Sequence, residues 1–298
     1  MASGKSLVVG ASGLVGGALM RVLRRAQIEA AGTYARSPAA GLEALDITDA
    51  ARVRACVERH RPATVFLAAA LTHVDYCEDH PDEAFASNVE GPRAVAEAAR
   101  ALGAQVVFYS TEYVFDGKAG PYDEQDPPSP LSVYGRSKLA AERAICDLVE
   151  NALILRTTVL FGWDSNSQNF AMQVYRKVRS GERMTIPMDQ FGNPTLAEYL
   201  AEVSLTLAQR GARGVVNVVG TDLVARSDFA LALVKLFEGS PDLIVPVPTE
   251  SLKQKAPRPL RGGLKTAKLE RLLGGKAMAL DDALKRLELQ RKAGAAIT

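Results

Sequence analysis

Hydrophobic and polar positions alternate in blocks along the first half of the chain. Short apolar runs, typical of buried strands, are separated by longer segments in which apolar residues recur every three or four positions, as on one face of a helix. The predicted strands are 6–10, 28–35, 42–48, 63–70, 105–111 and 152–162, and the predicted helices are 14–26, 49–61, 81–103 and 134–149. Strands that alternate with crossover helices predict a parallel sheet in an α/β fold.

After Gly162 the pattern is looser. It predicts a loop followed by a helix over 164–182, helices over 194–211, 225–239, 266–273 and 280–292, and a strand over 214–220. The proline-rich segment 116–130 lies between a strand and its helix, so we expect a long loop over the sheet edge; such loops are usually functional. We therefore expect a doubly wound domain over 1–162, to which 194–220 return. Residues 163–193 and 221–298 would form a smaller C-terminal substrate-binding domain.

Three glycines follow the first predicted strand in the run VVGASGLVGG. Gly10 permits a tight turn, Gly13 lets the backbone approach a pyrophosphate, and Gly16 allows close packing of helix against strand. The pyrophosphate would then lie at the N-terminus of the following helix. The run predicts a Rossmann-type dinucleotide site, and the alternative is a plain packing turn.

The second predicted strand ends GTYARSP, without a carboxylate to bind a ribose 2′-hydroxyl. Arg36 and Ser37 lie where that acid would be, and a guanidinium suits the 2′-phosphate of NADP. Asp46 ends the third strand, where its carboxylate is placed to accept from an adenine amino group. The expected cofactor is NADPH, with NADH as the second choice, and the alternative for Arg36 is a solvated loop residue.

Tyr134 and Lys138 lie four residues apart in PLSVYGRSKLAAERAI, so they share one face of a helix. A nearby ammonium lowers the pKa of a phenol, which would let Tyr134 transfer a proton near neutral pH. Thr111, at the end of a strand, would donate to the alkoxide that develops when hydride reaches a ketone. The alternative for the pair is two exposed helix residues.

Composition narrows the choice of partners. A formal net charge of +2, with acids and bases interspersed, argues against a nucleic-acid or membrane surface. The three cysteines are far apart and form no C-x-x-C, which fits a reducing compartment. No apolar stretch has the length of a membrane span or of a signal peptide, so we expect a cytoplasmic protein.

The glycine run, the strand ending FLAAA and the Y-x-x-x-K pair together resemble the extended short-chain dehydrogenase/reductase family, and the chain looks like its dTDP-4-dehydrorhamnose reductase group. The segments that carry this likeness are 69–91, 110–117, 130–142, 155–162, 189–195 and 258–264. The resemblance implies an NAD(P)H-dependent ketoreductase that reduces the 4-keto group of a nucleotide-linked deoxysugar, with dTDP as the expected nucleotide. It also implies a homodimer that pairs helices 81–103 and 134–149 in a four-helix bundle.

The resemblance assigns roles to single residues. Tyr134 would donate the proton, Lys138 would hold the nicotinamide ribose and bias Tyr134, Thr111 would bind the carbonyl oxygen, and Asn88 matches the family's structural asparagine. The expected cofactor residues are Gly10, Ser12, Gly13, Leu14, Val15, Gly16, Arg36, Ser37, Asp46, Ile47, Ala68, Ala69, Ala70, Asn88, Tyr134 and Lys138. The expected substrate residues are Thr72, Val74, Glu112, Tyr113, Val114, Phe115, Asn169, Gln190 and Arg258.

The sequence departs from the group at Glu112, where its reductases usually carry Asp, and at Val159, where some members carry Trp. Both changes bear on which sugar is bound. A 4,6-dehydratase needs an Asp-Glu pair after the threonine, but this chain has Glu112-Tyr113. A nucleotide-sugar epimerase with tightly held NAD, and a regulatory subunit resembling the methionine adenosyltransferase β-subunit, remain alternatives.

Two other kinds of site are weighed against the sequence. Residues 73–80, HVDYCEDH, cluster possible metal ligands but lack tetrahedral ligand spacing, so no metal is predicted. A Ser-His-Asp hydrolase would need a G-x-S-x-G elbow, which the sequence lacks.

Overall fold

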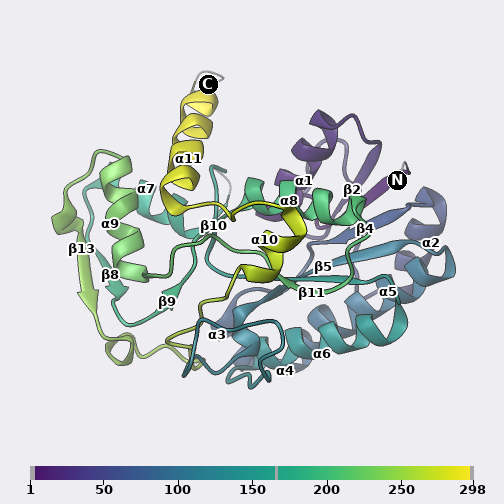
Figure 1. Ribbon diagram of the computed structural model, residues 1–298, viewed down its shortest axis with the longest axis horizontal. Coiled ribbons are helices and arrows are strands. Elements are labelled where there is room, and N and C mark those ends of the chain that lie inside the picture. Colours follow the sequence, from purple (N-terminus) through teal and green to yellow (C-terminus); the bar gives the residue numbers. More distant parts are fainter. Residues whose placement is uncertain (1–3, 165–166, 296–298) are drawn as a thin grey trace.

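The computed structural model describes residues 4–164 and 167–295. Its centre is a parallel seven-stranded sheet in the order β11-β6-β5-β4-β1-β2-β3, with helices on both faces (Figure 1). The strands are β1 (Ser6–Val9), β2 (Ala30–Tyr34), β3 (Glu43–Ala44), β4 (Thr64–Leu67), β5 (Gln105–Thr111), β6 (Leu153–Thr157) and β11 (Gly214–Asn217). The predicted α/β, doubly wound, Rossmann-type sheet is confirmed. The chain runs outwards in both directions from the boundary of β1 and β4, which is where such folds bind ligands at the carboxyl ends of their strands.

Two helical layers enclose the sheet because its strands are apolar on both sides. In β1, Val8 faces one hydrophobic cluster, whereas Leu7 and Val9 face the other. Two helices, α1 (Leu14–Arg25) and α8 (Ala197–Gln209), pack on the first face. On the second face lie α2 (Ala50–His60), α5 (Gly91–Ala101) and α6 (Val133–Leu148).

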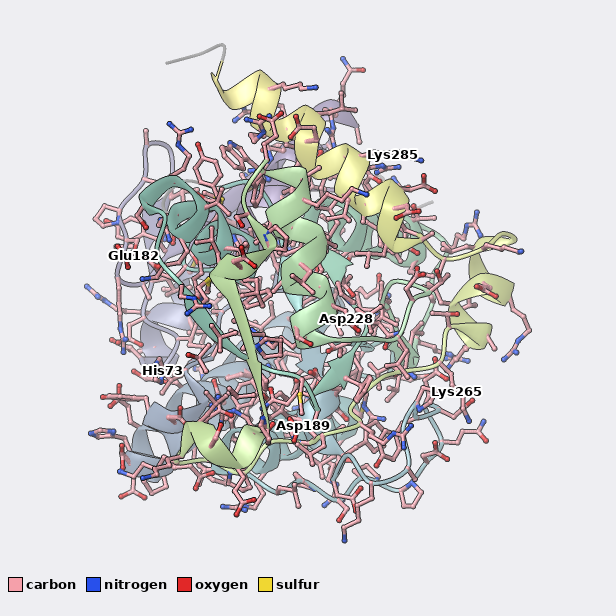
Figure 2. All side chains as sticks on the ribbon, turned by 90° about the vertical axis from the view of Figure 1, so that its left-hand side faces the viewer. His73, Glu182, Asp189, Asp228, Lys265 and Lys285 are labelled. Carbon is pink, nitrogen blue, oxygen red and sulfur yellow. The ribbon has the colours of Figure 1, made fainter. Side chains whose placement is uncertain are left out.

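A smaller region lies beside the sheet, at the left of Figure 1. Its elements are α7 (Phe170–Ser180), β8 (Met184–Pro187), β9 (Phe191–Gly192), β12 (Val224–Ala225), α9 (Arg226–Leu236) and β13 (Ile244–Val247). Strands β8 and β13 pair in parallel, and β9 pairs antiparallel with β12. Seen from this end in Figure 2, the charged Glu182 and Asp228 are exposed at the surface.

Six further elements complete the fold. They are α3 (Val74–Asp79), α4 (Pro81–Phe85), β7 (Leu160–Phe161), β10 (Thr195–Leu196), α10 (Ala267–Leu273) and α11 (Leu280–Ala295). Strand β11 joins the large sheet beside β6, and α8 packs on α1. The division into two domains stays a prediction, and the parts of it that fall on 1–3, 165–166 and 296–298 lie outside the described residues.

The predicted elements differ from the structure in three places. The predicted helix 81–103 is divided by a π-helical turn, η1 (Ala86–Glu90), which places Asn88 in the interior. The predicted strand 42–48 has only two paired residues. The predicted strand 152–162 is broken at Val159, whose φ of 43° lies in the left-handed region that β-branched residues rarely adopt.

The loop after β5 is tied to a segment near the C-terminus. The amide of Arg261 donates to the carbonyl of Gly117 at 2.9 Å, and the amide of Tyr122 donates to the carbonyl of Gly263 at 2.7 Å. A Cβ on Gly117, which has a φ of 72°, would lie 2.5 Å from Cα of Pro259, so this approach requires glycine. The expected long loop therefore lies against residues 259–264.

A buried ion pair fixes α6 to the sheet. Arg156 of β6 donates from Nε and NH2 to the two carboxylate oxygens of Glu142, at 3.0 and 2.7 Å. Both side chains are only 4% exposed. A paired guanidinium and carboxylate in this forked geometry satisfy one another where water is excluded.

Across the described ranges, none of the helices is long and apolar enough to span a membrane.

Arg156→Met is expected to lower the free energy of unfolding by about 3–5 kcal/mol, because it leaves the Glu142 carboxylate buried without a partner. Urea unfolding followed by circular dichroism measures the loss. Arg93→Met is the control, since Arg93 pairs with Glu97 at the surface and should cost no more than about 1 kcal/mol. Equal losses for the two variants would contradict the role given to the buried pair.

Candidate active site

The three predicted catalytic residues come from two elements that meet at the carboxyl edge of the sheet. Thr111 is the last residue of β5, and Tyr134 and Lys138 lie on the first two turns of α6. Ser132 caps α6 by accepting from the amide of Gly135 at 3.1 Å. All three catalytic side chains are buried.

Burial controls the ionisation of Tyr134. It raises the phenol pKa, the charges of Glu112 and Tyr113 raise it further, and a hydrogen bond with Thr111 opposes the change. The sequence predicted a pKa lowered by Lys138, and the structure gives the opposite direction because desolvation penalises the phenolate. Tyr134 is therefore a protonated phenol at neutral pH, the form that donates a proton.

Lys138 is only 2% exposed, and its Nζ lies 3.9 Å from the centre of the Phe108 ring. Burial lowers the pKa of its ammonium to about 7, although the charge of Glu142 opposes the shift. Near pH 7, the side chain therefore exchanges readily between its charged and neutral forms.

Glu112 directly follows Thr111 and is buried with it. Its carboxyl group accepts from the hydroxyl of Thr111 at 2.9 Å and from that of Thr158 at 2.7 Å. Burial raises the pKa of Glu112 to about 7, despite these two hydrogen bonds. The longer Glu side chain, in place of the group's usual Asp, thus links the ends of two neighbouring strands.

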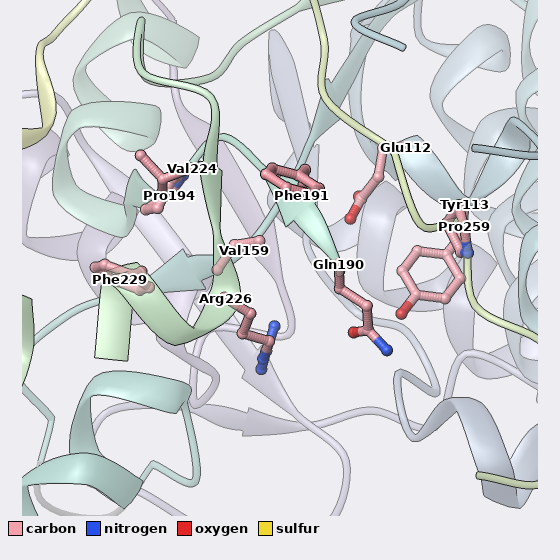
Figure 3. A pocket seen from close by; sticks show the side chains of 11 residues that line it. Glu112, Tyr113, Val159, Gln190, Phe191, Pro194, Val224, Arg226, Phe229 and Pro259 are labelled. Atoms are coloured by element: carbon pink, nitrogen blue, oxygen red, sulfur yellow. The ribbon is translucent and has the colours of Figure 1, made fainter. Parts of the chain in front are cut away.

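A pocket opens beside this group (Figure 3). It is lined by Glu112, Tyr113, Val159, Gln190, Phe191, Gly192, Pro194, Val224, Arg226, Phe229 and Pro259. The ring of Tyr113 meets that of Tyr134 edge to face, with 5.6 Å between centres, which connects the pocket to Tyr134. A pocket of apolar walls with a few polar groups, next to residues with shifted pKa values, is typical of a substrate site.

Some of the expected substrate residues line the pocket and others lie outside its lining. Glu112, Tyr113 and Gln190 line the pocket, as the sequence suggested. Arg258 lies close by and pairs with Asp75 at 3.0 Å. Thr72, in the loop after β4, is exposed, and Val74 begins α3. Whether each contacts a substrate stays a prediction.

Val114 and Phe115 do not lie in the pocket. Both side chains are buried in a hydrophobic cluster, where Phe115 stacks on Tyr122 with 4.2 Å between ring centres. The short helix η2 (Glu112–Val114) turns Tyr113 towards the pocket and Val114 into the core. The expectation that Val114 and Phe115 bind the substrate is therefore corrected, because their side chains have no free surface.

The side chain of Asn169 has a structural role. Its side chain caps α7 by accepting from the amide of Met172 at 3.4 Å, and it donates to the carbonyl of Gly162 at 3.0 Å. It is absent from the pocket lining. Whether it also contacts a substrate stays a prediction.

The pocket contains residues that the sequence did not suggest. Arg226 begins α9, and Phe191, Val224 and Phe229 belong to neighbouring elements of the smaller region. In the sequence Arg226 looks like any first-turn helix residue. Only the pairing of β9 with β12 brings it to the carboxyl edge of the sheet.

The glycine loop fits a dinucleotide. A Cβ on Gly10 would lie 2.7 Å from the amide nitrogen of Ala69, and one on Gly16 would lie 2.1 Å from the carbonyl oxygen of Gly10, so internal packing requires both glycines. A Cβ on the exposed Gly13 would meet only the Gly10 carbonyl oxygen, at 3.4 Å, an ordinary contact. No acidic residue lies in the first turn of α1. These features suit the approach of a pyrophosphate.

The remaining expected cofactor residues surround this loop. Ser12, Leu14 and Val15 complete its turn into α1, and Ala68 to Ala70 follow β4 next to Gly10. Arg36 and Ser37 are exposed after β2. Arg36 donates to Glu83 at 3.2 Å. Asp46 is exposed and its carboxylate accepts from the Thr48 amide and hydroxyl, whereas the Ile47 side chain is buried.

Asn88 is buried, and its side chain bonds to other parts of the protein. Its side chain accepts from the amide of Leu71 at 2.8 Å and donates to the Leu71 carbonyl and to Ser137. These bonds fasten the loop after β4 to α6, next to Lys138. The structure thus agrees with the structural role that the resemblance implied.

The acidic side chains of residues 73–80 each bond to a different partner. Asp75 pairs with Arg258, Asp79 pairs with Lys255, and Glu78 accepts from the amide of Val133. Within the described residues, a close set of possible metal ligands occurs elsewhere, at Glu43, Cys56 and His60, and there Glu43 already pairs with Arg59. No metal site is proposed at either place.

Comparison with known proteins gives a consistent result. The sequence profile described as the RmlD substrate binding domain matches residues 4–291. The chain is 37% identical over 260 residues to a dTDP-4-dehydrorhamnose reductase of Streptomyces griseus, covering 85% of this chain and 83% of the relative. It is 33% identical to the probable low-salt glycan biosynthesis reductase Agl14 of Haloferax volcanii, covering 95% and 97%.

A solved structure has the same fold. The crystal structure of dTDP-4-dehydrorhamnose reductase from Bacillus anthracis in complex with NADP superposes with a TM-score of 0.89 at 29% identity. The match covers 96% of this chain and 99% of that one.

The raised pKa of Glu112 predicts how stability depends on pH. Folding favours the protonated acid, so its stabilisation is complete below the ordinary pKa of 4.5 and is lost as the pH rises through about 7. Glu112→Gln cannot ionise, so its stability relative to wild type should rise by about 2–3 kcal/mol between pH 5 and pH 8. Urea unfolding at the two pH values measures this.

Glu150→Gln is the control, because the Glu150 side chain is 94% exposed and should show no such change. A difference between Glu112→Gln and wild type that does not vary with pH would show that the Glu112 carboxyl titrates normally.

Proposed function

The chain belongs to the RmlD substrate-binding domain family, and from this membership we infer that it is an NADPH-dependent reductase of a nucleotide-linked 4-keto deoxysugar. The observation that carries the proposal is the meeting of Thr111, Tyr134 and Lys138 in one buried site beside a pocket. The relatives named dTDP-4-dehydrorhamnose reductase support dTDP as the nucleotide.

The cofactor would be held by the glycine loop, with Arg36 near its 2′-phosphate and Lys138 at the nicotinamide ribose. A bound nicotinamide supplies the hydride. Gly13 leaves room for the pyrophosphate and the N-terminus of α1 favours its charge.

The residues of the chain handle the ketone oxygen and its proton. The phenol of Tyr134 is protonated because its pKa is raised, so it donates the proton that the oxygen needs. The hydroxyl of Thr111 stabilises the negative charge on that oxygen. The Thr111 hydroxyl donates to Glu112 in the structure, so it would turn from Glu112 to the ketone oxygen when the substrate binds.

Other functions on this fold are less well supported. In place of the acid pair that a dehydratase needs, the structure has Glu112 followed by Tyr113, whose ring packs on the proton donor. An epimerase would be purified with tightly bound NAD. A regulatory subunit would bind NADPH without turnover, and the assay below separates this alternative from an enzyme.

We also propose a cytoplasmic location and a homodimer. The three thiols, Cys56, Cys77 and Cys146, are free, as in a reducing compartment. Helices α5 and α6 pack side by side, and their outer faces carry the small residues Ala94, Ala140 and Ala144 among charged ones. Such faces let the helices of a second copy approach closely.

Tyr134→Phe is expected to bind NADPH normally and to lose about 10²–10⁴-fold in turnover, because it keeps the ring and removes the proton donor. Loss of NADPH absorbance with a panel of 4-keto sugar nucleotides measures turnover. Tyr175→Phe, on α7 against Trp163, is the matched control. Turnover near wild type in Tyr134→Phe would exclude this phenol as the proton donor.

Arg36→Ala should weaken NADPH binding by about ten- to a hundredfold and leave NADH binding nearly unchanged, because a charge-assisted bond to the 2′-phosphate is lost. Fluorescence titration of both cofactors measures this. Glu83→Gln is a second variant that removes the internal partner of Arg36 and should not weaken NADPH. If Arg36→Ala affects both cofactors equally, the guanidinium does not bind the phosphate.

Light scattering at micromolar concentration should give the mass of a dimer. Ala140→Glu, which places a charge on the outer face of α6, should shift the mass towards a monomer without loss of helix content. A wild-type monomer would contradict the proposed pairing of α5 and α6.

A further inference from the structure

Arg226 is a charged group that the mechanism above does not use. It lines the pocket, and burial lowers the pKa of its guanidinium. Its carbon Cζ lies 4.2 Å from the centre of the Phe170 ring, so one flat face of the guanidinium rests on an aromatic side chain. The N–H groups lie in the plane of the guanidinium and point outwards from its edge, so this contact with its face does not cover them.

No acid forms an ion pair with Arg226 within residues 4–164 and 167–295. None of the ion pairs or side-chain hydrogen bonds of these residues involves its guanidinium. Asp228, two residues further along α9, is exposed, and Asp75 is engaged by Arg258. Glu112 shares its carboxyl group with two threonine hydroxyls and has a pKa near 7. Glu112 does act electrostatically on Arg226, but with its pKa raised to about 7 it is only partly ionised at neutral pH, so it does not fully balance the guanidinium charge.

Other polar groups point to the same space. Figure 3 shows the polar ends of Arg226, Gln190 and Tyr113 turned towards one side of the pocket. The Nε2 of Gln190 donates to Thr249 and Gln254, each at 3.1 Å, so both of its N–H groups are engaged and its Oε1 remains as an acceptor. The donors available to an oxygen anion are therefore the guanidinium fork of Arg226 and the phenol of Tyr113.

We propose that Arg226 is the receptor for an oxyanion of the substrate, a phosphate or carboxylate group, and that it determines which nucleotide sugars bind. A half-buried guanidinium without an ion-pair partner costs free energy that an incoming oxyanion recovers. This inference rests on the proposed function, since it concerns the same pocket. The oxyanion has two possible sources: the diphosphate of the nucleotide, or a carboxylate on the sugar.

Calorimetric titration tests the inference without any turnover. The ligands are thymidine, dTDP, dTDP-glucose, UDP-glucose and UDP-glucuronate, each titrated into wild type and Arg226→Gln. We expect Arg226→Gln to weaken the ligand whose oxyanion it binds by about ten- to a hundredfold, because a charge-assisted forked bond is lost. Neutral thymidine should bind both proteins equally.

The pattern of losses identifies the source of the oxyanion. Equal losses for dTDP, dTDP-glucose and both UDP-sugars indicate the diphosphate. A loss confined to UDP-glucuronate, with UDP-glucose unchanged, indicates a sugar carboxylate. Either pattern supports the receptor role.

Two outcomes would overturn the inference: wild-type affinity of Arg226→Gln for every anionic ligand, or a loss for thymidine as large as that for dTDP. Lys235→Gln is the matched control, since it removes one exposed positive charge from the same helix. Arg226→Met, whose side chain can still rest on Phe170, replaces Arg226→Gln if the latter does not fold.

These results are separable from the proposed function. Absence of 4-keto sugar reduction with intact dTDP binding would defeat the ketoreductase and leave the receptor role standing. Normal reduction, together with unchanged ligand binding in Arg226→Gln, would defeat the receptor role and leave the ketoreductase standing.

Discussion

The ion pair between Arg156 and Glu142 fixes the geometry on which the site depends. It joins the middle of α6 to β6, and β6 neighbours the strand that ends at Thr111. Tyr134, Lys138 and Glu142 are spaced by four residues, so they share the inner face of one helix. Holding Glu142 in place therefore sets the height and rotation of the Tyr134 and Lys138 side chains relative to Thr111.

The same burial that tightens this packing determines the chemistry. In three neighbouring groups the pKa is shifted in the direction that favours the neutral form. The pKa values of Tyr134 and Glu112 are raised, and that of Lys138 is lowered. The site thus contains a phenol, an acid and an amine whose charges are costly until a ligand enters. Arg226 is different, because a guanidinium keeps its charge under all ordinary conditions. It is the permanent cation of the pocket.

Patterns that act locally could be predicted from the sequence. The glycine loop, the parallel strands and the Tyr134/Lys138 face depend on residues close together in the chain, and the structure contains each of them. The direction of the Tyr134 pKa could not be predicted, because the spacing reveals a nearby charge but not the loss of water. The π-helical turn that brings Asn88 inside depends on tertiary contacts with Leu71 and Ser137.

The substrate side of the site was harder to predict for a related reason. Tyr113, Val114 and Phe115 form one motif in the sequence, but a short helix sends neighbouring side chains in opposite directions. Arg226 reaches the pocket through a strand pair between residues more than thirty positions apart. No periodic pattern in the sequence indicates such a pairing.

The contacts between Gly117 and residues 259–264 bear on how the protein is made. Synthesis proceeds from the N-terminus, and domains begin to fold as they emerge. The loop after β5 leaves the ribosome about 140 residues before the segment that covers it, and closing so long a loop is slow. The strands from β1 to β6 can thus pair while the wall of the pocket formed by Pro259 is still untranslated. The nascent chain completes this pocket only after residues 259–264 have been synthesised.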